Sequence, residues 1–349
     1  MRVLLCGSAA QAAHMRERLK KDIVDCGNYD CSDNLNKLST INEIDDMILV
    51  AADPALKENL LKHGIPEKAI IEYWRFEKTT FLNPIEGLIS EKEVVDGLIF
   101  GMSHSQCAID TQMLQGHFYK LAAPSLDLFF HLGFLNKILA DNMIDVEQVH
   151  NIIIELPYYI FNYDLSRFGD FVLTKLKYFD VLGNYHHYKD MDTIIKWKIF
   201  MSIFDEGPTS AVGDNSSIGN IIKKMIKYPI RAYRIWTLHD KVWEHIYYET
   251  IRENTRYFNE FLSKLESTFL NAKIYILVMP FNPIFRISHR DSVRRMKNIF
   301  YDVANSKHLR VIDEFDYFSN SKYFDDHCHL NKMGGRLYTE HLVQLIKNN

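Results

Sequence analysis

Short apolar runs alternate with amphipathic segments along the first part of the chain. The runs at residues 3–6, 47–51 and 69–73 have the composition of buried strands, and residues 9–21 and 54–63 have the spacing of helices. Strands that alternate with helices in this way favour a small parallel sheet with crossover connections. We therefore expect a small Rossmann-like α/β domain at the N-terminus.

A second series of apolar runs follows a polar stretch. Residues 94–100, 151–156 and 273–279 predict strands, and a last short strand is expected at residues 309–312. Because helical segments separate these runs, they favour a doubly wound parallel sheet with its loops at the carboxyl ends of the strands. The fold class expected for the whole chain is α/β, with a larger sheet domain preceded by a smaller one.

These elements predict two domains of unequal size. The small domain is expected at residues 1–75, a linker at 76–93 and the larger domain at 94–349. An aromatic-rich, helical insertion at about residues 162–248 interrupts the larger domain, and its polar stretch at 207–217 is typical of a lid or binding loop. We expect this insertion to shape a substrate site.

Composition and charge narrow the classes of function. A formal net charge of -4 gives no general attraction to nucleic acid, so no such partner is expected. The apolar run at the N-terminus is shorter than the roughly 7 to 15 residues of a signal peptide, and no run reaches the roughly 18 of a membrane span. We therefore expect a cytoplasmic protein. Its thiols are expected to be reduced, because the five cysteines are scattered without a CxxC pair: Cys6, Cys26, Cys31, Cys107 and Cys328.

The first turn, Cys6-Gly7-Ser8-Ala9, lies where a dinucleotide fingerprint would begin, but it carries one glycine where that fingerprint needs three. The glycines serve the tight turn, the approach of the pyrophosphate and the packing of the helix. We therefore expect no cofactor, and we interpret the small domain as a packing or partner-docking module.

The strongest candidate nucleophile is Ser103, in the turn Gly101-Met102-Ser103-His104-Ser105 after the run at residues 94–100. A glycine before a serine at the end of a buried strand lets the backbone turn sharply, so that the hydroxyl and its amide face a cleft. Ser105 competes for this role, but Ser103 has the Gly-x-Ser spacing.

Near the C-terminus, Asp326 precedes His329 by three residues in a loop that opens a closing helix. An aspartate and a histidine so placed can orient and supply a general base. His327 and His104 are competitors, but the Asp-x-x-His spacing selects His329 as the partner of Asp326. The stretch from Asp325 to His329 also offers metal ligands, yet adjacent residues rarely all point at one ion, so no metal is expected.

Together these segments resemble the SGNH/GDSL hydrolase superfamily, and most of all its divergent bacterial branches that modify surface polysaccharides or teichoic acids. The resemblance covers about residues 94–349 and rests on Gly101-Met102-Ser103, with Met102 in place of an aspartate, and on Asp326 with His329. It implies a flavodoxin-like (SGNH) sheet and a catalytic triad of Ser103, His329 and Asp326. The implied activity is that of a serine-dependent acyl esterase or O-acyltransferase acting on an acylated carbohydrate through an acyl-enzyme.

The oxyanion blocks of that superfamily are missing in their standard form. Ser125, Tyr158 and Asn162 are the candidates that could donate to an oxyanion instead. Losing one such donor costs about 100- to 1000-fold in rate. The alternative is therefore a catalytically silent SGNH-like scaffold that binds a glycan or a partner protein.

A basic segment follows the polar stretch of the insertion. Five cations recur there at helical spacing, although Pro229 would break or kink a continuous helix. A solvated helix face is one interpretation, and an anionic carrier or membrane surface is the other. The cations are Lys223, Lys224, Lys227, Arg231 and Arg234.

Overall fold

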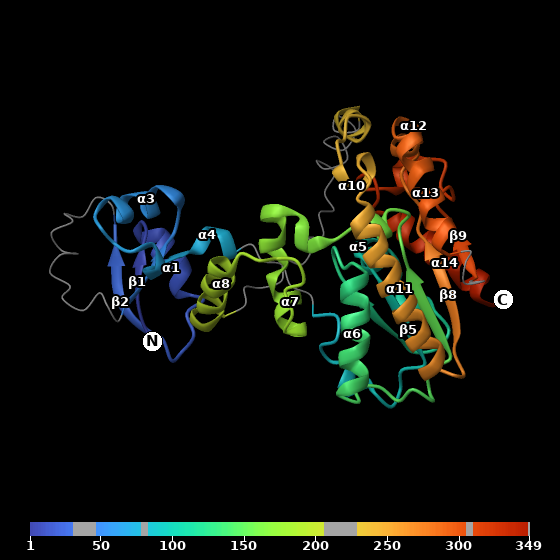
Figure 1. Cartoon of the computed structure of the whole chain (residues 1–349), viewed down its shortest axis with the longest axis horizontal. Coiled ribbons are helices and arrows are strands. Elements are labelled where there is room, and N and C mark those ends of the chain that lie inside the picture. The colour runs from blue at the N-terminus through green and yellow to red at the C-terminus, as the bar shows by residue number, and fades with distance from the viewer. Residues whose placement is uncertain (31–46, 78–82, 206–228, 305–309, 348–349) are drawn as a thin grey trace. The chain divides into compact units, whose positions relative to one another are not determined.

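The computed structural model describes residues 1–30, 47–77, 83–205, 229–304 and 310–347 of the 349-residue chain (Figure 1). The chain divides into two compact units, and each contains one sheet whose strands are all parallel, with helices on its faces. The expected α/β class is thus confirmed, with a sheet of four strands in the first unit and one of five strands in the second.

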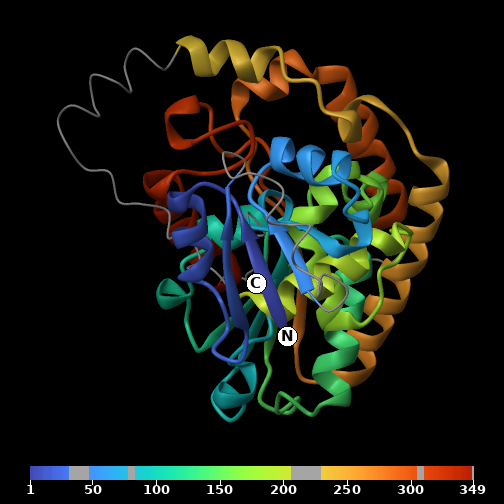
Figure 2. The same cartoon turned by 90° about the vertical axis from the view of Figure 1, so that its left-hand side faces the viewer.

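The first unit carries its four strands in the order β2-β1-β3-β4. The strands are β1 (Arg2–Cys6), β2 (Val24–Tyr29), β3 (Met47–Ala51) and β4 (Ile70–Glu72). Figure 2 shows α1 (Ala9–Arg16) and α3 (Pro54–Lys62) on opposite sides of this sheet, as right-handed crossovers in opposite directions require. The sequence analysis missed β2, because this exposed edge strand lacks an apolar run.

The boundary between the units differs from the expected one. Of the described part of the insertion, residues 166–205 belong to the first unit, although the whole insertion was expected in the larger domain. The physical reason is aromatic packing: Phe200 and Phe204, at the end of α8 (Met191–Ile203), lie against Tyr73 with ring centroids 5.8 and 5.1 Å away. Lys20 Nζ also donates to the carbonyl of Met201 in α8 at 2.6 Å. The 3-10 segment Gly169–Lys175 and α7 (Leu176–Leu182) come before α8, and α4 (Tyr73–Phe76) follows β4.

The second unit carries its five strands in the order β6-β5-β7-β8-β9. Counted within the unit, this order is 2-1-3-4-5. The strands are β5 (Gly97–Gly101), β6 (Phe118–Ala122), β7 (Asn151–Glu155), β8 (Lys273–Val278) and β9 (Val311–Asp313). The sequence analysis missed β6, an edge strand with a lysine at its centre.

Helices cover both faces of the five-stranded sheet. On one face, α14 (Lys332–Lys347) packs against the short helix α5 (Ser103–Ala108) and contributes Tyr338 and Leu342 to the core. On the other face, α6 (Leu128–Ala140) lies beside α11 (Tyr248–Thr268) (Figure 1). Further helices of this unit include α10 (Lys241–Glu244), α12 (Pro283–Ser288) and α13 (Arg290–Ala304). Among the described residues, no helix combines the length and apolar character needed to cross a membrane.

Candidate active site

The turn from β5 to α5 presents Ser103 at the carboxyl edge of the second sheet. All five residues of β5 are buried, and Ser103 is the first residue of α5, so its backbone N–H has no acceptor within the helix. Gly101 is required here by close approach, because a Cβ would lie 2.1 Å from Ser105 Oγ and 2.9 Å from Glu155 Oε2. The turn therefore places a hydroxyl and a free amide side by side.

The loop between β9 and α14 carries Asp326 and His329. An antiparallel bridge between Phe324 and Leu330 closes this loop, and Asp325 N–H donates to the carbonyl of His329 at 2.9 Å. Phe324 and Leu330 are buried in the core of the unit, so the two ends of the loop are anchored. The tight closure fixes the direction of the side chains that it carries.

Ser103, His329 and Asp326 lie in hydrogen-bonding contact. His329 Nε2 is 2.7 Å from Ser103 Oγ, and His329 Nδ1 is 2.7 Å from Asp326 Oδ2. Asp326 Oδ1 accepts the backbone N–H groups of Cys328 at 2.8 Å and His329 at 2.7 Å. The structure thus brings together the three residues expected as nucleophile, base and orienter, although Ser103 and His329 are 226 residues apart in sequence.

The partners of His329 fix its tautomer. A carboxylate can only accept, so Nδ1 donates to Asp326 and the neutral ring turns the lone pair of Nε2 toward the hydroxyl of Ser103. Burial alone would lower the pKa of His329, but the hydrogen bond and charge of Asp326 outweigh it and raise this pKa. Burial likewise acts to raise the pKa of Asp326, yet the bonds and charge of His329 hold it well below its ordinary range. This arrangement can take a proton from Ser103.

Hydrogen bonds and close packing fix helix α14 against α5, and these contacts keep His329 beside Ser103. Thr339 Oγ1 donates to the carbonyl of Ala108 at 3.1 Å, and Asp110 N–H donates to Thr339 Oγ1 at 3.1 Å. A Cβ on Gly335 would lie 2.9 Å from the carbonyl oxygen of Ala108, so only glycine allows this approach. The geometry of the triad therefore depends on the contact between these two helices.

Asn282, at the start of α12, supports the loop and was given no role from the sequence. Its side chain is fully buried, and Nδ2 donates to the carbonyl of Asp326 at 2.9 Å. Its backbone N–H donates to the carbonyl of His327 at 3.1 Å, and its Oδ1 accepts from Ser321 Oγ at 2.9 Å. The signal in the sequence was a polar residue in the turn between the buried strand β8 and α12.

The competitors of the predicted triad are engaged elsewhere. Ser105 is fully buried and its hydroxyl lies 3.2 Å from both the carbonyl of Met102 and Glu155 Oε2. His104 Nδ1 lies 3.0 Å from Glu155 Oε1. Burial lowers the pKa of His327 to about 4. The sequence analysis missed the central carboxylate of this group, Glu155, which ends the apolar strand β7.

Two of the three oxyanion candidates are committed to other contacts. Tyr158 donates to Asp313 at 2.6 to 2.7 Å, and Asn162 Nδ2 donates to two backbone carbonyls at 2.7 Å. Both donors are therefore engaged within the protein, which disfavours these two side chains as donors to an oxyanion. Ser125 remains a candidate: it follows β6, which pairs with β5, and its φ of 68° is a rare conformation for a non-glycine residue.

A nearby group of side chains has the composition of a metal site. His104, Cys328 and His329 offer ligand atoms within 4.8 Å of one another. The Nδ1 atoms of both histidines are occupied by Glu155 and Asp326, and burial raises the pKa of Cys328 well above its ordinary value. A metal needs the thiolate, so this donor set favours proton transfer over metal binding.

The expected partner surface is only partly described. Three of its five cations, and the polar stretch at 207–217, lie outside the described residues: Lys223, Lys224 and Lys227. Arg231 and Arg234 lie in a helical stretch at 229–236, with Pro229 as its first described residue rather than a break in it. Arg231 Nη1 donates to the carbonyl of Phe324 at 3.0 Å, so one of these cations supports the loop of the triad.

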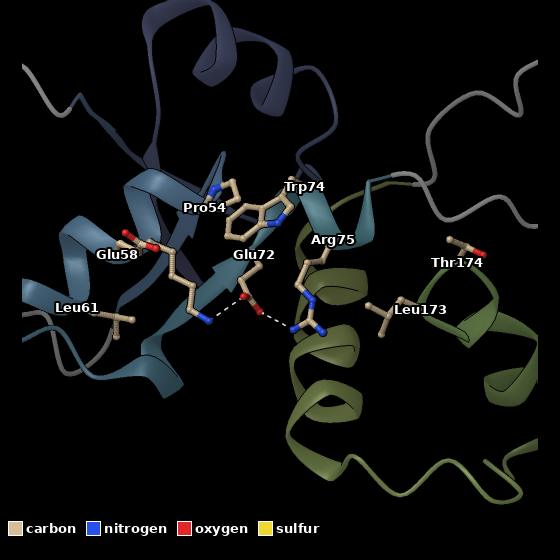
Figure 3. A pocket seen from close by; sticks show the side chains of 9 residues that line it. Pro54, Glu58, Leu61, Glu72, Trp74, Arg75, Leu173 and Thr174 are labelled. Carbon is tan, nitrogen blue, oxygen red and sulfur yellow. Dashed lines mark hydrogen bonds and ion pairs between the residues drawn. The ribbon is translucent and has the colours of Figure 1, made fainter. Parts of the chain in front are cut away.

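The first unit has a pocket of about 630 Å³ at the carboxyl end of β4 (Figure 3). Trp74 and one side of α3, from Pro54 to Leu61, line it, and Leu173 and Thr174 lie across from them. Glu72 lies 2.8 Å from Lys57 Nζ and 2.9 Å from Arg75 Nη1, so the charges at its floor are paired. None of the residues that line it belongs to the predicted triad.

Comparisons with known proteins leave the family open. No family model matches the chain, and no curated protein matches it. One solved structure that is similar is provisionally named a platelet activating factor, from Streptococcus pneumonia. It is 9% identical, with a TM-score of 0.41, over 84% of this chain and 99% of that chain. A similarity this low assigns neither a fold nor an activity.

Proposed function

We propose that the chain is a serine-dependent acyl esterase or O-acyltransferase. One observation carries the proposal: Ser103, His329 and Asp326 form a continuous chain of hydrogen bonds, with 2.7 Å from Ser103 to His329 and 2.7 Å from His329 to Asp326. These distances are within the range that general-base activation of a hydroxyl needs. The low pKa of Asp326 keeps its carboxylate charged beside the imidazole.

In the proposed reaction, Ser103 Oγ attacks an ester carbonyl while His329 Nε2 takes its proton. Asp326 holds Nδ1 and stabilises the cationic ring. The free N–H of Ser103 donates to the oxyanion, and Ser125 is the proposed second donor. The tetrahedral intermediate collapses to an acyl-enzyme as His329 returns the proton to the leaving alcohol. Water or a sugar hydroxyl then takes the acyl group.

The substrate class rests on resemblance rather than on geometry. The Gly-x-Ser turn and the Asp-x-x-His loop are similar to those of SGNH/GDSL proteins, and the strand order 2-1-3-4-5 agrees with a flavodoxin-like sheet. We therefore propose an acylated carbohydrate as the substrate, in the modification of a bacterial surface glycan. Proposed partners are this glycan, an acyl donor and an anionic carrier or membrane surface; the proposed site of action is the cytoplasm.

Covalent labelling tests the proposal. The native chain, Ser103→Ala and the control Ser8→Ala are treated with a fluorophosphonate, and the intact mass is measured. We expect one adduct on the native chain and on Ser8→Ala, and none on Ser103→Ala. Release of acetate from 4-nitrophenyl acetate, with and without a sugar acceptor, then separates hydrolysis from transfer.

A silent scaffold that binds a glycan or a partner protein is the second candidate. The observation in its favour is that Tyr158 and Asn162 donate to other groups, which leaves fewer donors for an oxyanion. If the native chain is folded but gains no adduct, the esterase proposal fails and the scaffold is favoured.

A further inference from the structure

A buried carboxylate lies directly behind the turn that carries Ser103. Glu155 ends β7, and its side chain is fully buried. Glu155 Oε2 accepts the backbone N–H of Met102 at 2.7 Å and the hydroxyl of Ser105 at 3.2 Å. Glu155 Oε1 accepts His104 Nδ1 at 3.0 Å. Three donors from one turn thus converge on one carboxylate from another strand.

A charge at this depth is costly unless several donors compensate it. Burial by itself raises the pKa of Glu155, but the charge and hydrogen bond of His104 and the bonds from Met102 and Ser105 outweigh it and lower this pKa. The group therefore stays a carboxylate in the folded protein. An apolar residue would be the cheaper choice for packing alone, so the charge has a use beyond filling space.

The three contacts act on the nucleophile and on the base. Met102 is the residue before α5, so the bond to its N–H sets the direction in which Ser103 leaves the strand. The ring of His104 lies beside that of His329, with 5.4 Å between their centroids, and the charge of Glu155 contributes to the raised pKa of His329. Met102 occupies the position at which the SGNH/GDSL block has an aspartate. The carboxylate at this turn is therefore that of Glu155, which comes from β7.

We propose that Glu155 is a positioning residue of the Ser103 turn, which holds the Met102 amide and the His104 ring so that Ser103 meets His329. This inference rests on the proposed function. It deepens that function by naming a group that acts through Ser103 and His329 without touching the substrate.

Glu155→Gln keeps the volume and removes the charge. An amide oxygen can still accept from Met102, but the amide nitrogen then faces His104 Nδ1 and forces the other tautomer of that ring. We expect fluorophosphonate labelling to slow by about 10- to 100-fold, because a displacement near 1 Å at a nucleophile costs about this much. At low pH the labelling rate falls as His329 is protonated, and we call this fall the acid limb. It should also move to lower pH, because His329 loses a nearby negative charge.

The pH profile separates positioning from mere folding, since a structural role alone would not move the limb. The groups that face His329 and stay unchanged are Asp325, Asp326, His327 and Cys328 on its own loop and His104 on α5. Glu91→Gln is the matched control, because Glu91 also pairs with a histidine, His117, but on the surface. Native rates and an unshifted limb in Glu155→Gln would overturn the inference.

Glu155→Asp keeps the charge but draws the carboxylate back from Met102. Its labelling should be slower with the limb at the native pH, and this variant carries the test if Glu155→Gln does not fold. A native rate in Glu155→Asp would then contradict the inference.

If the native chain itself is not labelled, the proposed function fails, and the ¹³C-histidine NMR titration of His329 tests the inference separately. A lower pKa of His329 in Glu155→Gln supports a Glu155 that acts on the base, and an unchanged pKa overturns it.

Discussion

Each unit carries a serine in the turn from the first strand of its sheet to the next helix, and the two serines have different partners. Ser8 follows β1 and caps α1: its hydroxyl accepts the N–H of Gln11, and the side chain of Gln11 accepts the N–H of Ser8. Ser103 follows β5 and lies 2.7 Å from His329 Nε2. The same residue type thus stabilises a helix end in one unit and meets a base in the other.

The carboxyl edges of the two sheets differ in the same way. In the first unit, Glu72 is paired with Lys57 and Arg75, which carry fixed positive charges at neutral pH. In the second unit, Asp326 is paired with an imidazole whose other nitrogen faces a hydroxyl. Only the second arrangement can move a proton near neutral pH. A parallel sheet therefore offers a position for chemistry, and the side chains at its edge decide whether chemistry follows.

The largest effect is expected from a variant that disrupts the hydrogen bonds from Ser103 through His329 to Asp326. In Asp326→Asn, the amide oxygen can still accept the N–H groups of Cys328 and His329, but the amide nitrogen faces Nδ1 and imposes the wrong tautomer on His329. We expect fluorophosphonate labelling to fall by about 10⁴-fold. The matched change in the first unit, Glu72→Gln, should leave labelling unchanged. Equal losses in both variants would show that labelling does not depend on the triad.

A smaller effect should follow from a displacement of the helices that carry the triad. Gly335→Ala places a Cβ against the carbonyl of Ala108 and pushes α14 away from α5, so labelling should slow by about 10- to 100-fold. Gly7→Ala introduces a comparable clash, 2.9 Å from Ala52 Cβ, in the first unit. It should lower the midpoint of thermal unfolding but not the labelling rate. A normal rate in folded Gly335→Ala would contradict the role of this helix contact.

The pH dependence of the labelling rate tests the role of His329 without a mutation. The neutral form of His329 is the base, and it is lost as the pH falls through the pKa of the folded protein. Because this pKa is raised, the loss should begin at a higher pH than it would for a free histidine, whose pKa is about 6.5. The labelling rate as a function of pH measures this limb. A limb below that value would show that Asp326 does not stabilise the cationic ring.

The smallest effect concerns the serine of the first unit. Ser8→Ala removes the cap of α1, and we expect a loss of about 0.5 to 2 kcal/mol in the free energy of unfolding. Chemical denaturation measures this loss, and intact-mass labelling checks that the adduct persists. A loss of labelling in this variant would contradict the assignment of Ser8 to helix capping alone.

Strands that are continuous apolar runs could be predicted from the sequence, but two of the edge strands could not. β1, β3, β7 and β8 are apolar runs, because strands buried on both faces need continuous apolar sequence. β2 and β6 are edge strands with polar residues, and their pairing is decided by neighbours far along the chain. The sequence did not predict either that residues 166–205 belong to the first unit, because this depends on aromatic contacts with Tyr73.

For the candidate site, the sequence by itself determined the residue types and their local spacing: a serine after Gly-x at a strand end, and an Asp-x-x-His loop before the last helix. Those features are local, so the chain alone displays them. Only the tertiary structure decided that Ser103 meets His329, that Glu155 accepts the N–H of Met102, and that Tyr158 and Asn162 donate elsewhere. The reason is physical: a hydrogen bond depends on atoms within about 3 Å, and folding brings such atoms together from distant parts of the chain.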